Sequence, residues 1–225
     1  MFDVKNLENT LNSKNDLRKY FNQAKKLVYN YKPKNKKKEE FYVQQNIALA
    51  NNSFDNRFLV VDMEWQFSQE SIKETDDPIV KTRIDLVIVD TKPNELGIND
   101  IYLAELKVGI GATEGKSGIK DHIKNFKEIT DKTEVCNDVK NDVESIIKNK
   151  SDLGLIGGKK KDLKLSDKPK MMLILAHRNK AEQYKLKHYA NIAKNEAKKI
   201  GICEIDMSEP QKIDLQELFI LKAES

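Results

Sequence analysis

Residues 83–108, RIDLVIVDTKPNELGINDIYLAELKV, decide the fold. Two apolar runs, at 83–91 and 101–108, lie on either side of the turn segment KPNELGIND. Short apolar runs bounded by breakers predict strands, and a short polar connection predicts that the two strands pair antiparallel. A third run at 58–67 alternates between apolar and polar residues, with the odd-numbered residues from Leu59 onward expected on the apolar side. Together the three runs predict an antiparallel meander.

Helical spacing of apolar residues predicts helices on both sides of this meander. The chain therefore reads as two helices, three strands, a helix, a strand and a helix, followed by one or two terminal strands. This order predicts an α/β fold with a mixed central sheet flanked by helices. The expected helices cover 17–31, about 37–52, 119–147 as one long helix or two, and 186–200; the further strands cover 171–177, 202–205 and 218–221.

No internal repeat and no linker interrupts the sequence, so we expect residues 1–225 to form one domain. Within it, 1–36 is a helical addition at the N-terminus, 37–180 is the core, and 181–225 adds a C-terminal helix and strands.

The amino-acid composition limits the classes of protein to which the chain can belong. Of 225 residues, 39% are hydrophobic and 34% are charged, and 40 basic residues nearly balance 36 acidic ones. Basic residues cluster at 34–38 and 159–164, where they either contact phosphates or reflect the general abundance of lysine. Cys136 and Cys203 stand in no metal-binding spacing. No apolar stretch reaches membrane-spanning length, so we expect a cytoplasmic protein that does not contact the membrane.

Charged residues interrupt the two apolar runs at 83–91 and 101–108. Glu105 and Lys107 are two positions apart on one expected strand, so they share a face, and Asp85 on the paired strand can lie beside them. Carboxylate oxygens suit Mg²⁺ or Mn²⁺, and a backbone carbonyl from Ala104 or Leu106 can add a ligand. A metal there can activate water for attack on a phosphodiester, and a nearby lysine can orient that water. The alternative is that these are edge-strand charges that keep the sheet soluble.

The pattern resembles the PD-(D/E)XK phosphodiesterase superfamily, which includes many restriction-type endonucleases. The resemblance rests on the Asp of RIDLVIVD, the Glu and Lys of AELKV, and the order helix, meander, helix, strand over about 37–180. Ile84 stands where the family pattern has proline. The resemblance implies a restriction endonuclease-like αβββαβ core in which Asp85 and Glu105 ligate the metal and Lys107 assists the nucleophile.

The resemblance also implies further residues of the site. The family often places a Glu on the helix before the meander, which here is Glu40, or its neighbour Glu39. The family also often places a polar residue on the helix after the motif, which here is His122; the alternative is that His122 is a histidine of the core. Glu64 on the first strand is either an additional metal ligand or a solvated surface residue.

Three functions compete on this basis. The first is a metal-dependent nuclease, an Mg²⁺- or Mn²⁺-dependent hydrolase of phosphodiester bonds in DNA rather than RNA. The second is a catalytically silent module of the same fold that binds nucleic acid or regulates. The third is a structural interaction protein with charged helices as its surface. Because many enzymes of the superfamily dimerise to cut both strands, a homodimer is compatible with the first function.

Overall fold

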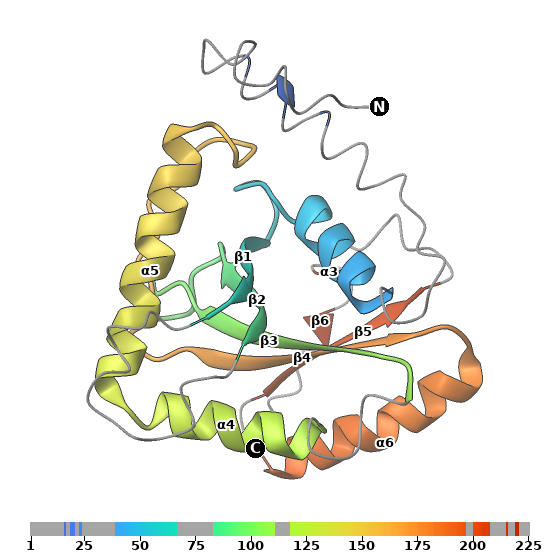
Figure 1. Cartoon of the computed structure of the whole chain (residues 1–225). Helices are drawn as coiled ribbons and strands as arrows, with labels where there is room; N and C mark the ends of the chain where they lie inside the picture. Colours follow the sequence, from blue (N-terminus) through green and yellow to red (C-terminus); the bar gives the residue numbers. More distant parts are fainter. Residues whose placement is uncertain are drawn as a thin grey trace.

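A mixed six-stranded sheet lies at the centre of the part of the chain that the computed structural model describes (Figure 1). The strands follow one another in the sheet in the order of the chain, and the first three form an antiparallel meander, as predicted. The third, fourth and fifth strands are parallel, and the sixth is antiparallel to the fifth. The strands are β1 (Phe58–Trp65), β2 (Ile84–Asp90), β3 (Ile101–Val108), β4 (Lys170–His177), β5 (Ile200–Asp206) and β6 (Phe219–Ile220). The described residues are 16, 19, 20, 23, 39–66, 83–110, 118–196, 200–207, 215, 219 and 220.

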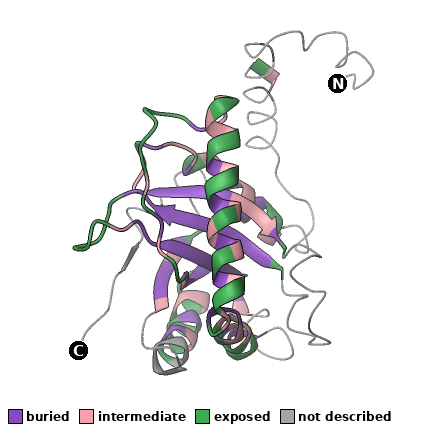
Figure 2. Ribbon diagram, turned by 90° about the vertical axis from the view of Figure 1, so that its left-hand side faces the viewer, coloured by how far each residue is buried: buried purple, intermediate pink, exposed green. Residues whose placement is uncertain are grey.

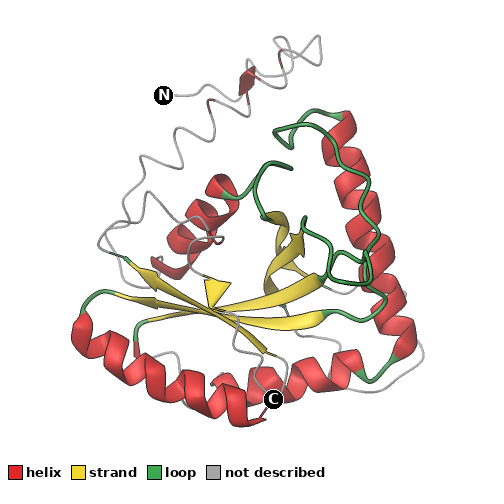
Figure 3. Ribbon diagram, turned by 180° about the vertical axis from the view of Figure 1, so that it is seen from behind, coloured by secondary structure: helices red, strands yellow, loops and turns green. Residues whose placement is uncertain are grey.

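Helices cover both faces of this sheet (Figure 1 and, from behind, Figure 3). One face carries α3, the other carries α4 and α6, and α5 stands beside β1 and β2. The segment expected as one long helix or two forms two, α4 and α5, separated by Asp131 and Lys132. The α/β class with a mixed, helix-flanked sheet is therefore confirmed. The helices are α3 (Glu39–Ala50), α4 (Ile119–Thr130), α5 (Thr133–Asp152) and α6 (Lys180–Glu196).

The inner strands are buried on both faces, which explains why their sequences are almost continuously apolar. Every residue of β2 is buried, and alternate side chains enter two different cores. Leu86 and Ile88 pack beneath α3, whereas Val87 and Val89 pack toward α5. Figure 2 shows the buried sheet behind α5, whose outer face is exposed.

The alternation predicted for the first strand is wrong beyond its middle, because β1 contains a bulge. Val60 is paired with Ile88, and Asp62 with the very next residue of β2, so Val61 is an extra residue. An extra residue reverses the faces of the side chains that follow it. Met63 therefore packs in the core beneath α3, although it was expected to share a face with Leu59 and Val61, which pack in the other core. Trp65 itself is a core residue, as predicted.

The described residues of the C-terminal portion complete the same sheet and core. Cys203 and Ile205 of β5 pack with Leu215 beneath α3. The backbone N–H of Leu215 donates a hydrogen bond of 3.1 Å to Oδ1 of Asn51, directly after α3. The expected helix over 17–31 lies outside the described residues, apart from three helical positions at 19, 20 and 23. No helix in the described part of the chain is long and apolar enough to cross a membrane.

Candidate functional site

The predicted site residues lie where β2 and β3 separate. The last registered pair between these two strands is Leu86 with Ala104, whereas β3 stays paired with β4 as far as Val108. Asp85 and Glu105 are the next positions on the two strands, so they stand just beyond the last pair. The separation removes backbone hydrogen bonds between the strands and leaves room for charged side chains.

The Asp85 carboxylate takes the place of a missing backbone partner. Its Oδ2 accepts a hydrogen bond of 2.8 Å from the backbone N–H of Leu106, and the side chain is buried. Burial raises the pKa of Asp85 to about 7; the negative charges of Glu105 and Glu40 add to the shift, and the Leu106 hydrogen bond and Lys107 oppose it. Near neutral pH this carboxyl group is therefore divided between its protonated and ionised forms.

Glu105, Lys107 and His122 form one buried cluster. Lys107 Nζ donates to Glu105 Oε1 over 2.6 Å, and the side chains of both residues are less than a tenth exposed. His122, in the first turn of α4, brings Nε2 to 3.0 Å from the same Glu105 oxygen and to 3.1 Å from Lys107 Nζ. The predicted motif residues and the predicted helix residue are thus in direct contact.

The position of His122 allows two protonation patterns. With a proton on Nε2, the ring donates to the Glu105 carboxylate. With the proton on Nδ1 instead, Nε2 accepts from the Lys107 ammonium. One nitrogen cannot do both at once, so the tautomer of His122 determines which of the two neighbours it is bonded to.

Glu40 approaches this opening from the first turn of α3, the helix on the opposite face of the sheet. Burial raises the pKa of Glu40; the charge of Lys107 opposes the shift, and the charge of Glu105 adds to it. One helical turn later, buried Gln44 donates its side-chain N–H to the backbone carbonyl of Asp85 over 3.2 Å. Gln44 was not predicted, although its i+4 spacing from Glu40 places both residues on one side of the helix.

Two other predicted acidic residues are engaged elsewhere. Glu64 forms an ion pair of 2.7 Å with Arg83. Glu64 also has a positive φ of 55°, so its backbone is strained at the end of β1. Glu39 forms an ion pair of 2.5 Å with Arg178, whose guanidinium also contacts Glu182. Of the two neighbouring glutamates of α3, Glu40 is therefore the one that faces the site.

A small cavity lies beside the cluster. It measures about 20 Å³ and is lined by both Glu105 and His122, together with apolar residues that include Phe126. This volume is sufficient for one water molecule. A water held there would touch the two groups of the cluster that can accept a proton.

The side chains that could ligate a metal ion do not converge on one point in the described part of the chain. Within the described ranges, no group of three or more His, Cys, Asp and Glu side chains could hold a metal ion as arranged. The geometry gives a reason: Glu105 directs an oxygen toward Lys107, and Asp85 directs one toward the Leu106 N–H. A metal ligated by Asp85 and Glu105 would have to take up a carboxylate oxygen that these bonds leave available.

The structure describes one of the two basic runs and not the other. The run at 34–38 lies outside the described residues, whereas Lys159, Lys160 and Lys161 form an exposed stretch directly after Gly158. Lys161 Nζ lies 3.4 Å from Thr91 Oγ1.

Comparisons with protein-family models, with curated proteins and with solved structures find no match for this chain. The function of the site is therefore inferred from its geometry and its charges.

Proposed function

We propose that the chain is a metal-dependent nuclease that hydrolyses phosphodiester bonds, with DNA as the expected substrate before RNA, and that its core has the restriction endonuclease-like topology. One observation carries the proposal: Asp85, Glu105 and Lys107 are all buried at the point where two strands separate. Buried charges are costly unless they have a partner or a function. If these positions had only a structural role, apolar side chains would stabilise the fold more, because they carry no desolvation cost.

The donor chemistry of the site fits a divalent cation. Carboxylate oxygens from Asp85 and Glu105, with the Leu106 carbonyl, are the hard ligands that Mg²⁺ and Mn²⁺ prefer. The raised pKa of Asp85 reflects burial and repulsion from Glu105 and Glu40, both of which a bound cation would offset. When bound, the cation would supply Lewis-acid stabilisation of the charge that develops on the phosphoryl group.

The remaining steps belong to the protein's own residues. Lys107 would orient the attacking water or stabilise the charged phosphoryl oxygens in the transition state. Glu40, whose pKa is raised by burial, and the imidazole ring of His122 are the groups that would receive the proton of that water. Gln44 would act as a positioning residue that holds the backbone of Asp85.

The test is cleavage of single- and double-stranded DNA and RNA with Mg²⁺ or Mn²⁺ and without either. We expect the wild-type chain to cleave only with metal. Glu105→Gln and Lys107→Met should each lower the rate at least about a hundredfold, because each removes a group that contacts the reacting atoms. Glu95→Gln and Lys92→Met, at exposed positions of the β2–β3 turn, are the matched controls.

Folding must be checked alongside activity, because removing one partner of a buried ion pair costs about 3–5 kcal/mol. The double variant Glu105→Gln with Lys107→Met removes both charges and should recover part of that stability while remaining inactive. Cleavage that survives in folded Glu105→Gln would contradict the proposal. Metal binding without cleavage of any substrate would instead favour the silent nucleic-acid-binding module.

A further inference from the structure

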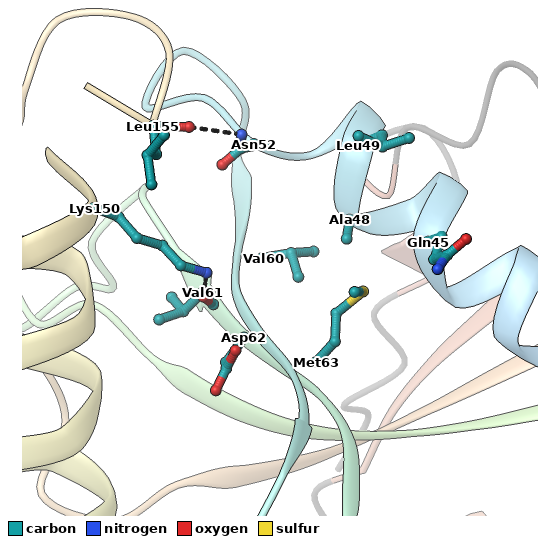
Figure 4. A pocket seen from close by; sticks show the side chains of 10 residues that line it. All are labelled: Gln45, Ala48, Leu49, Asn52, Val60, Val61, Asp62, Met63, Lys150 and Leu155. Atoms are coloured by element: carbon teal, nitrogen blue, oxygen red, sulfur yellow. Dashed lines mark hydrogen bonds between the residues drawn. The ribbon is translucent and has the colours of Figure 1, made fainter. Parts of the chain in front are cut away.

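A pocket of about 340 Å³ lies between α3 and α5, above β1 (Figure 4). Its walls are mainly apolar and include Leu49, Val60, Met63 and Leu155. The volume is in the range of sites that bind small molecules or single groups of a larger ligand. The pocket shares no lining residue with the cluster of Asp85, Glu105 and Lys107, so it is a separate feature of the molecule.

The bulge in β1 builds this pocket. Four consecutive residues, Val60 to Met63, line it, whereas a regular strand directs alternate side chains to opposite faces. The extra residue at Val61 re-aims the chain so that Asp62 and Met63 both reach the cavity (Figure 4). Bulges of this kind commonly re-aim side chains beside functional sites.

Polar groups surround the apolar walls. Asp62 and Gln45 reach the pocket from β1 and α3, and Lys150 extends across from α5 to donate its ammonium to the Val61 carbonyl. Asn52 Nδ2 donates to the Leu155 carbonyl over 2.8 Å and closes one end. The pocket therefore offers an apolar space with a carboxylate and an amide at its margin.

The pocket and the candidate site lie along the same helix, α3, about two turns apart. Glu40, Gln44 and Ala48 follow one another at four-residue spacing on α3, so they form one stripe that runs from the site to the pocket. At a rise of 1.5 Å per residue, Glu40 and Ala48 are about 12 Å apart along the helix. On β1, Met63 lines the pocket and is next to Glu64.

The opposite end of the pocket leads to exposed lysines. Leu155 belongs to a loop that is held against the end of α3, because the Phe54 N–H donates to the Gly157 carbonyl over 2.9 Å. Lys159 and Lys160 follow within a few residues and are exposed. The order along this surface is thus a site suited to a phosphodiester, an apolar pocket, and a basic loop suited to phosphates.

We infer that the pocket receives one unstacked base of a nucleic-acid strand whose phosphates lie over the candidate site on one side and the basic loop on the other. The inference rests on the proposed function for the class of its ligand. A base has flat apolar faces that suit the walls, and its edge can pair with Asp62 and Gln45. Because a carboxylate only accepts hydrogen bonds, Asp62 suits bases that carry an amino group better than thymine, whose one ring N–H donor lies between two carbonyl oxygens that would repel the carboxylate.

The experiment measures binding in EDTA, so that it does not depend on catalysis. Single-stranded oligonucleotides carry one 2-aminopurine at successive positions, and its fluorescence rises when the base leaves the stack. Wild-type protein should raise the fluorescence at one position of the bound strand. Ala48→Trp fills the pocket and should abolish the rise, whereas Ala50→Trp, at an exposed position of the same helix, should leave it unchanged.

A second variant avoids the burial of a large side chain. The wild-type chain should bind oligo(dC) about tenfold more tightly than oligo(dT), and Asp62→Asn should remove that preference while thermal unfolding stays unchanged. An undiminished fluorescence rise in folded Ala48→Trp, or equal affinity of the wild type for both oligonucleotides, would overturn the inference. Displacement of the fluorescent base by an apolar peptide, but not by a free nucleoside, would overturn it in favour of another occupant.

The experiments distinguish a failure of the nuclease proposal from a failure of the base pocket. A fluorescence rise without cleavage in the metal-dependent assay would keep the base pocket and reject the nuclease. Cleavage that Ala48→Trp leaves unchanged, without any fluorescence rise, would keep the nuclease and reject the pocket.

Discussion

At the scale of single residues, the candidate site concentrates charge where the fold would otherwise bury apolar side chains. Asp85, Glu105 and Lys107 stand on strands whose other members are almost all buried and apolar. The sequence was sufficient to predict that these three residues meet, because the two-residue period of a strand and a short connection determine which positions are neighbours. His122 was expected at the site only from the resemblance, and the structure places it against Glu105 and Lys107.

The partners of the more peripheral residues could not be predicted. Arg83 pairs with Glu64 because the bulge shifts the end of β1, and no pattern in the sequence indicates a bulge. Glu39 forms an ion pair with Arg178 instead of facing the site, and these two residues are far apart in the chain. Long-range ion pairs of this kind depend on the final arrangement of elements rather than on local spacing.

Because the pKa of Asp85 is raised, we expect the free energy of unfolding without metal to depend on pH. Its pKa is about 7 in the folded protein against an ordinary value of 3.8, so between these values the folded state holds a proton that the unfolded state has lost. The free energy of unfolding should therefore fall as pH rises from 4 toward 8, by an amount on the order of 3 kcal/mol from this group.

Urea unfolding in EDTA at a series of pH values measures this dependence. Asp85→Asn keeps the shape of the side chain and an oxygen that can accept from Leu106, so it should flatten the profile. Asp55→Asn, at an exposed position, is the control and should leave the profile as it is in the wild type. An equally steep profile in Asp85→Asn would mean that another group carries the titration.

At the scale of elements, the end of β3 is where the sheet is joined to the helices of both faces. Gly109 follows β3 with a φ of 68°, and its N–H donates to the Ala176 carbonyl over 2.8 Å. A Cβ at this position would lie 2.3 Å from Nη1 of Arg178. That guanidinium joins Glu39 at the start of α3 to Glu182 at the start of α6.

Gly109→Ala should therefore destabilise the protein in two ways. A positive φ costs a non-glycine residue about 1–2 kcal/mol, and displacement of Arg178 adds the loss of its ion pairs. Gly97→Ala provides the comparison, because Gly97 has a φ of 71° but no atom within 4 Å of the added Cβ. Chemical denaturation should give a larger loss for Gly109→Ala, and equal losses would show that Arg178 moves aside without cost.

The elements themselves were predicted well where periodicity was strong. The bounds of β3 agree with the apolar run at 101–108, and α3 begins and ends close to its predicted limits. The helical segment after the glycine-rich loop was left open as one helix or two, because its apolar spacing weakens without a proline or glycine to mark a break. The structure divides it at Asp131 and Lys132.

At the scale of the whole molecule, the proposed binding surface joins distant parts of the chain. The site, the pocket and the basic loop lie on β1 to β3, on α3, and on the segment after α5. The small net charge of +4 gives little indication of such a surface, since only the local arrangement of lysines matters for a bound strand.

Salt dependence measures how many phosphates the surface neutralises. Affinity for single-stranded DNA should fall with salt, with a slope of about -0.7 per phosphate contact. The double variant Lys159→Gln with Lys160→Gln should reduce the magnitude of that slope by about 1 to 1.5. Lys124→Gln with Lys127→Gln, exposed on α4, should leave the slope unaltered; equal effects of the two pairs would show that the loop has no special role.

The connectivity of the sheet has a consequence for how the molecule folds. Asp85, Glu105 and Lys107 belong to a single hairpin, β2–β3, whereas β4 reaches its parallel position beside β3 only after α4 and α5 have been crossed. Hairpins between strands close in sequence form faster than parallel pairings that need a long crossover. We therefore expect the hairpin that carries these residues to form while the rest of the core is still open to water, so that its carboxylates lose their water only when α3 and α4 dock.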